Sequence, residues 1–311
     1  QILFLVFLLF IFCTMLGVKL KNQLHLHILV FIAGFTAILG QLITIQAIPL
    51  VWFRMTMAGV LMLIFIKIKK ISLDVPFKVK IRFFLAGIVI ALHWITFFAA
   101  IKVSNISVTL AMFSTGAFFA SLLEPLIYKR KIIKYEIFFG IVVVVGVIMI
   151  MQIKGEYFYG IVLGIISAFL SSLFAVINGK LAKSYDASTI SFYEFLSGVL
   201  FISIFLLFDF EQGFSLSFFN ISFNDFIYLF ILSSICTAYA FIASVHVMKH
   251  ITAYSVVLTY NLEPIYGIVL AVIIFPSKEK MPLAFYVGCF LIISTVFFNA
   301  IIKHKNTKIN F

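Results

Sequence analysis

The chain alternates between long apolar runs and short polar segments over its whole length. Breaking the sequence at charged residues, prolines and polar clusters leaves ten apolar runs, most of them about 17 to 24 residues long. At 1.5 Å per residue, helices of this length cross a hydrocarbon core of about 30 Å. The pattern predicts ten membrane-spanning helices, at 26–46, 49–66, 83–101, 106–128, 135–151, 158–179, 190–208, 226–247, 252–275 and 283–302.

Composition supports a membrane protein. Hydrophobic residues make up 64% of the 311 residues and charged residues only 11%, whereas a soluble domain has about 25% charged residues. The net charge of +12 comes from lysines and arginines in the short polar segments. Because no nucleic-acid-binding motif accompanies them, we expect no nucleic acid partner and interpret the charge as a topology signal.

The distribution of basic residues predicts an orientation. With the segment before the first span on the inner side, 18 of the 23 lysines and arginines lie inside and four lie outside, and Arg54 lies within a span. Positive residues remain on the cytoplasmic side. We therefore expect a multi-pass inner (plasma) membrane protein whose ten-helix core has both termini in the cytoplasm.

The chain divides into an extension, two halves and a tail. We expect residues 1–25 to be an N-terminal extension, 26–152 and 153–303 to be five-helix halves, and 304–311 to be a cytoplasmic tail. Within the extension, residues 1–14 are interpreted either as an upstream addition before Met15 or as an extra peripheral helix. The apolar stretch fits a secretory signal poorly, because no basic leader precedes it.

The two halves resemble each other. Each begins with a helix rich in small or polar residues, "AGFTAILGQLITIQ" and "GIVLGIISAFLSSLFAVING". Each continues with a helix that has one charged residue shortly before a glycine, "WFRMTMAGVLML" and "FYEFLSGVLFIS". Since each half has an odd number of spans, the second is predicted to be inserted upside down. Inverted repeats around a midplane site are typical of transporters.

Three stretches and the ten-span layout resemble the EamA-type members of the drug/metabolite transporter superfamily. The stretches are "FRMTMAGVLML", "ALHWITFFAAIKVSNISVTLAMFSTGAFFASLLEPLIYKRK" and "MKHITAYSVVLTYNLEPIYGIVLAVIIF". The resemblance covers about 26–303. It implies two inverted five-helix repeats, export of amino acids or other small metabolites, and a central cavity lined by helices 1, 3, 4, 6, 8 and 9. Members often have a glutamate at the far end of helix 9; here Glu279 is displaced by Pro276, and no function is carried over to it.

Two charged residues occupy related places in the two halves. Arg54 lies about 7 Å along the second span from Pro49, within reach of a snorkelling side chain. Glu194 lies about one turn from the opposite interface. Both are interpreted as gating or orientation residues: one alternative is anchoring at the interface or orientation of the repeat, and the other is a substrate or gating role.

Glu263 follows about eleven residues of the ninth predicted span, near the bilayer midplane. A carboxylate there costs about 2.5 to 3.5 kcal/mol on insertion scales. It must therefore face a wet cavity, pair with another group or hold a proton. We interpret it as a contact for a substrate ammonium or a proton site, with a neutral, hydrogen-bonded structural acid as the alternative.

His93 lies near the middle of the third span and titrates near neutrality when unperturbed. It is either a hydrogen-bonded core residue or part of the site. Trp94 and Phe97 follow at helical spacing and form a candidate aromatic wall. Other polar groups predicted to lie in spans need partners and are candidate cavity residues: Tyr239, Tyr260, Asn261, Ser114, Thr115, Gln41 and Ser171.

Other polar and small residues have structural interpretations. Glu124 is expected to form a local ion pair with Lys129 and Arg130. The small residues Gly160, Gly164, Ala168 and Ser172 recur every fourth position and predict a close helix contact. The three cysteines lie in apolar runs without paired spacing, so neither a disulfide framework nor a metal site is indicated.

These observations favour a carrier of small metabolites, most readily an amino-acid exporter that works by alternating access. We expect no catalytic residues and no cofactor, and we consider protons a candidate coupling ion. A sugar-phosphate or nucleotide-sugar exchanger is the alternative within the superfamily, although such a cargo calls for several basic cavity residues. A channel or an intramembrane enzyme is less favoured, because no HExxH, GxSxG or paired-aspartate motif is present. The sequence leaves the oligomeric state open.

Overall fold

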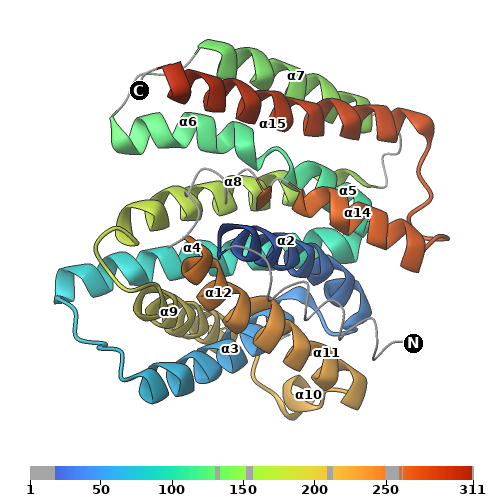
Figure 1. Ribbon diagram of the computed structural model, residues 1–311. Coiled ribbons are helices and arrows are strands. Elements are labelled where there is room, and N and C mark those ends of the chain that lie inside the picture. Colours follow the sequence, from blue (N-terminus) through green and yellow to red (C-terminus); the bar gives the residue numbers. More distant parts are fainter. Residues whose placement is uncertain are drawn as a thin grey trace, which may run out of the picture.

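A computed structural model describes residues 18–129, 134–151, 157–208, 213–248, 259–260 and 262–309 (Figure 1). Within these ranges all regular structure is helical. The first half contains α2 (Val18–Leu42), α3 (Ala47–Lys69), α4 (Phe77–Val103), α5 (Ile106–Phe113), α6 (Gly116–Tyr128) and α7 (Lys134–Met151). The second half contains α8 (Phe158–Leu181), α9 (Ala187–Phe208), α10 (Leu216–Phe219), α11 (Phe223–Ser233), the π-helix η2 (Ser234–Tyr239), α12 (Ala240–Met248), α14 (Glu263–Ile274) and α15 (Leu283–Ile309).

Each predicted apolar run contains helix in the described residues, and two runs are interrupted. The fourth run divides into α5 and α6 at Ser114 and Thr115. Their hydroxyls donate to the carbonyls of Leu110 and Met112, at 3.0 and 2.6 Å, and such local bonds compete with a regular helix. The eighth run changes from α11 to the wider η2 before it continues as α12.

Seven described helical segments are long and apolar enough to cross a membrane, if α5 with α6 and α11 with η2 and α12 each count as one segment, and three shorter apolar helices accompany them. The shorter ones are Phe138–Ile150, Glu263–Ile274 and Leu283–Thr295. Large apolar side chains such as Leu126 and Phe290 are more than 70% exposed. Exposure of this kind over many helices suits a lipid environment, whereas a soluble protein rarely exposes such patches.

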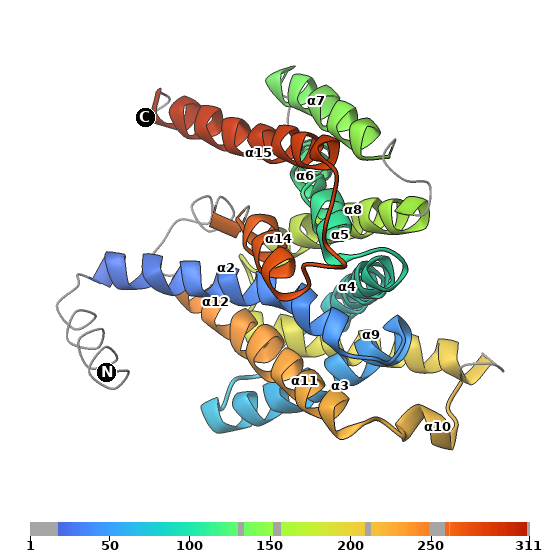
Figure 2. The same ribbon diagram turned by 90° about the vertical axis from the view of Figure 1, so that its right-hand side faces the viewer.

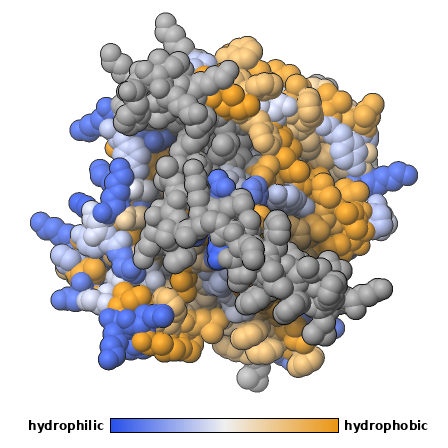
Figure 3. Space-filling view, in the orientation of Figure 1, coloured by the Kyte–Doolittle hydropathy of each residue, from blue (hydrophilic) through white to orange (hydrophobic). Residues whose placement is uncertain are grey.

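Hydrophilic residues gather at one end of the helices. Exposed lysines lie at the end of α3, the start of α4 and the end of α8. Those helix ends lie toward the left in Figure 1, and Figure 3 shows hydrophilic residues along that edge, with hydrophobic residues over much of the rest of this face. The apolar belt and the basic end are the arrangement expected of a membrane protein.

The contacts between helices follow the order of the two halves. α2 packs against α14, and its counterpart α8 packs against α5 and α6. Likewise α4 packs against α9, and α11 packs against α3. α7 and α15 pair at the periphery, as Figures 1 and 2 both show. Each contact thus has a mate in the other half, which fits a two-repeat layout.

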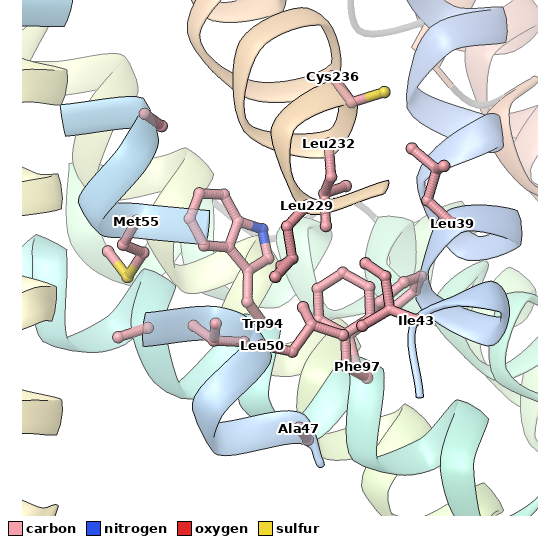
Figure 4. Packing of buried hydrophobic residues seen from close by; sticks show 14 of the residues in the cluster. Leu39, Ile43, Ala47, Leu50, Met55, Trp94, Phe97, Leu229, Leu232 and Cys236 are labelled. Atoms are coloured by element: carbon pink, nitrogen blue, oxygen red, sulfur yellow. The ribbon is translucent and has the colours of Figure 1, made fainter. Parts of the chain in front are cut away.

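The largest buried apolar cluster lies between the halves. Figure 4 shows Trp94 of α4 between Met55 of α3 and the helix that carries Leu229 and Leu232. Leu39 of α2 closes the cluster on another side. Residues from both halves therefore form this cluster together.

Two carboxylates of the second half hold turns of the first half. Glu279, 1% exposed, accepts hydrogen bonds from the backbone N–H groups of Ile106 and Ser107, at 3.0 and 2.9 Å. Asp225 accepts from both the backbone N–H and the hydroxyl of Thr44, each at 2.6 Å. The displacement of Glu279 by Pro276 therefore does not leave it without a partner, because it caps the start of α5.

Candidate functional site

Arg54 lies inside the protein. It is the eighth residue of α3, about 10 Å from the start of that helix, and only 3% of it is exposed. Its Nε donates to the Thr237 hydroxyl at 2.9 Å. Thr237 and the rings of α4 cover the guanidinium, and this favours an interior role for Arg54 over interfacial anchoring.

Aromatic rings surround the guanidinium. Its Cζ lies 3.9 Å from the Trp94 ring centroid and 5.6 Å from that of Phe98. Such a desolvated cation–π contact contributes about 2 kcal/mol or more. The Trp94 ring also neighbours Phe195 and Phe241 of the second half. Trp94 of the predicted aromatic wall thus lies against the Arg54 guanidinium and stabilises its positive charge.

The π-helix η2 supplies the partner of Arg54. The Thr237 hydroxyl donates to the Leu232 carbonyl five residues earlier, at 2.7 Å, and so has a lone pair left for the Arg54 Nε. Insertions of this kind are frequent at functional sites. Sequence analysis missed Thr237, because nothing in "SSICTAYA" distinguishes a π-helix from an ordinary helix.

Glu263 is the first residue of α14 and is followed by Pro264 in the first helical turn, a position that proline favours. Gly34 of α2 holds this helix close, since a Cβ on it would lie 3.1 Å from the Glu263 carbonyl oxygen. The half-buried carboxyl interacts electrostatically with Arg54. Glu263 of the second half and Arg54 of the first half therefore lie in one interior region.

His93 is a hydrogen-bonded interior residue. Its Nδ1 lies 3.1 Å from the Ser167 carbonyl oxygen and 2.9 Å from the Ser167 hydroxyl. Its ring stacks on Phe113 at a centroid distance of 5.5 Å, and Phe97 lies beside both. These contacts join α4, α5 and α8, and they favour the core interpretation of His93.

Glu194 of α9 is buried between helices. It is fully buried, and Asn178 of α8 donates to its Oε2 at 3.3 Å. A Cβ on Gly87 of α4 would collide with the Glu194 backbone. The close α4–α9 contact encloses its side chain, and this favours an interior role for Glu194 over interfacial anchoring.

The two candidate tyrosines form hydrogen bonds with residues other than Arg54 and Glu263. The Tyr239 hydroxyl lies 2.7 Å from Nε2 of His25, and 43% of the residue is exposed. The Tyr260 hydroxyl lies 2.8 Å from that of Ser244. Tyr260 also interacts electrostatically with Glu263, and this links it to the acidic group of the interior.

The remaining candidates divide by position. Ser114 and Thr115 are buried at the break between α5 and α6. Gln41 near the end of α2 and Ser171 on α8 are half-buried. Asn261 lies outside the described residues. Nothing in these positions brings the four described side chains to Arg54 and Glu263.

The small residues of α8 form the predicted helix contact. A Cβ on Gly160 would collide with Ser104, and one on Gly164 would lie 2.8 Å from the Met112 Cβ. The Ser172 hydroxyl donates to the Gly116 carbonyl at 2.7 Å. The close contact is confirmed, and it brings α8 against α4, α5 and α6. Glu124 is half-buried near the end of α6, and its predicted partner Arg130 lies outside the described residues.

Comparison with known protein families finds the same family in each half of the chain. The model of the EamA-like transporter family matches residues 23–152 and again 158–301. The chain belongs to the EamA-like transporter family. It is therefore an integral membrane transporter of the drug/metabolite transporter superfamily, and this confirms the resemblance seen in the sequence.

The structural comparison agrees on the fold. A solved structure described as "Crystal structure of protein" has a TM-score of 0.61 and 13% sequence identity, over 89% of this chain and 96% of its own. At this identity the likeness concerns the fold alone. No match was found among the curated proteins. EamA members are transporters rather than enzymes, so the interior of this chain is a candidate path for a small molecule.

Proposed function

We propose that this EamA-family transporter exports amino acids or similar amphipathic small metabolites by alternating access around an interior site. The observation that carries the proposal is the carboxyl of Glu263 at the junction of the two halves, where it interacts with Arg54, whose guanidinium lies against the Trp94 ring. A carboxylate complements the ammonium of an amino acid, and aromatic rings offer apolar surface to its side chain.

The proposed topology has ten spans in two inverted repeats, 26–152 and 153–303, with both ends of the ten-helix core in the cytoplasm of the inner membrane. Residues 1–25 precede the repeats, and 304–311 form a cytoplasmic tail. The distribution of basic residues and the mated helix contacts support this arrangement.

Proton coupling is part of the proposal and rests mainly on Glu263. Arg54 and Tyr260 both interact with this carboxyl, so a change in its charge alters the field in the interior. His93 contributes less support, since its Nδ1 is already bonded to Ser167. If replacing both Glu263 and His93 left transport equally dependent on pH, the coupling proposal would be wrong.

A sugar-phosphate or nucleotide-sugar exchanger is the second candidate within the superfamily. A phosphate cargo calls for several basic groups in the cavity. In the described residues Arg54 is the one arginine or lysine that is fully buried, and this disfavours an anionic cargo.

The test uses the full chain in liposomes and a panel of radiolabelled amino acids. Saturable uptake with counterflow is expected for the native chain, whereas a channel would show neither. Glu263→Gln removes the charge at nearly constant size, so we expect at least a tenfold loss of uptake, on the order of one charge-assisted hydrogen bond. Glu124→Gln is the matched control and should transport normally.

The outcomes separate the parts of the proposal. Uptake that Glu263→Gln retains in full would return Glu263 to a structural role and leave the cargo class intact. No saturable uptake of any amino acid by the native chain would overturn the proposed cargo.

A further inference from the structure

One nitrogen of the Arg54 guanidinium, Nη1, has no hydrogen-bond acceptor in the described part of the chain. A guanidinium carries five N–H donors. Nε is bonded to Thr237, but Nη1 is fully buried and lacks a partner in the described part of the chain. An unsatisfied buried donor is costly, and more so when it is charged. Its position among aromatic rings, which offer no acceptor in the plane of the guanidinium, points to an acceptor that comes from outside the chain.

The chain's own nearby acid does not supply that acceptor. Glu263 interacts with Arg54 through space, yet within the described residues the two groups form no direct hydrogen bond or ion pair. The positive group belongs to α3 of the first half, and the negative group to α14 of the second. Two opposite charges are thus held apart in one interior.

The surroundings of the positive group, Arg54, are aromatic. The rings of Trp94 and Phe98 lie against the guanidinium, and Phe195 and Phe241 extend the aromatic surface. Arginine binds a carboxylate through two parallel N–H donors. Separated charges beside aromatic surface are complementary to a zwitterion with an apolar side chain.

We propose that Arg54 binds the carboxylate of the transported amino acid through its unpaired Nη1 edge. This assignment rests on the proposed function, in which Glu263 faces the ammonium. It makes Arg54 a specificity-determining residue that selects α-amino acids with apolar side chains over the corresponding amines. Nη1 is sealed from solvent in this conformation, so the carboxylate reaches it when the helices of the two halves separate.

The test compares phenylalanine with phenethylamine, which lacks only the carboxylate. Both are used as competitors of radiolabelled phenylalanine uptake by the full chain in liposomes. For the native chain, we expect phenylalanine to compete about 10- to 100-fold better than phenethylamine, the range of one charge-assisted contact. Arg54→Gln should abolish this preference, and Arg54→Lys should retain part of it.

Arg82→Gln is the matched control, because Arg82 is exposed near the start of α4; it should behave as the native chain. If Arg54→Gln does not yield a monodisperse protein, Arg54→Lys and the native competition decide the matter. Equal competition by the amine in the native chain would overturn the role of Arg54 but leave the proposed function standing. So would an unchanged preference in either Arg54 variant. Failure of the native chain to transport any amino acid would overturn both.

Discussion

At the scale of single residues, two buried charged side chains of this transporter form hydrogen bonds with residues far away in the sequence. Glu279 reaches the start of α5, and Arg54 reaches Thr237 in η2. Both bonds join the first half to the second. In an apolar environment such bonds have no competing water, and losing one partner leaves the other unsatisfied. These residues therefore hold the halves together as well as serving any site.

Glu279→Gln should destabilise the fold. The two carboxylate oxygens accept from the N–H groups of Ile106 and Ser107, whereas an amide offers one acceptor oxygen and an NH₂ group. We expect a loss of about 1–3 kcal/mol in the free energy of unfolding, measured as a lower melting temperature in detergent. Asp74→Asn, in an exposed loop, should change stability by no more than about 0.5 kcal/mol. Equal melting temperatures for both variants would contradict the capping role.

At the scale of helices, glycines set how closely neighbours approach. α7 and α15 meet through a reciprocal pair: a Cβ on Gly146 would lie 3.0 Å from the Gly288 carbonyl oxygen, and one on Gly288 would lie 2.9 Å from that of Gly146. Because these neighbours are backbone atoms, they cannot rotate away. Close approach through small residues is a general means of packing helices in membranes.

Gly288→Ala should therefore separate α7 from α15. The added methyl would also press on Ile150 Cγ1 at 2.8 Å, and overpacking of this kind costs about 1–3 kcal/mol. Gly59→Ala is the control, since its Cβ would meet only the Phe195 Cβ at 3.6 Å; it should be neutral or stabilising by up to about 1 kcal/mol through helix propensity. Thermal unfolding of both variants in the same detergent checks the prediction, and a stabilised Gly288→Ala would refute it.

At the scale of the whole molecule, the mated helix contacts and the basic end of the helices agree with one proposed topology. Lys183 lies in the connection after α8, at the end where basic residues gather, and Lys280 lies in the connection after α14. Both are exposed. The proposed topology places Lys183 in the cytoplasm and Lys280 outside.

Cysteines introduced at these two positions should differ in accessibility. In a chain whose native cysteines are replaced, Lys280→Cys should react with a membrane-impermeant maleimide in intact cells. Lys183→Cys should react only after permeabilisation, because the bilayer separates the two connections. Labelling of both from outside, or the reverse order, would refute the proposed orientation.

Much of the fold could be predicted from the sequence, because helix formation in a membrane depends on local composition. The positions of the apolar runs, the resemblance of the halves and the small-residue contact of α8 all follow from short-range patterns. The breaks at Ser114 and in η2 did not follow, since their hydrogen bonds compete with helix geometry only in a given packing environment.

The candidate site was less accessible to sequence reasoning. Depth along α3 suggested that Arg54 could reach an interface, but depth does not say which helices surround a side chain. Trp94 is 40 residues from Arg54 and Thr237 is 183 residues from it. The first contact arises only when α3 packs against α4, and the second only when the two halves pack. The sequence alone determined a helical membrane protein, because composition and periodicity are local, and the resemblance of its longer stretches to a family indicated a transporter. Only the tertiary structure decided that Arg54 and Glu263 share an interior, because contacts between distant residues depend on how the helices are arranged.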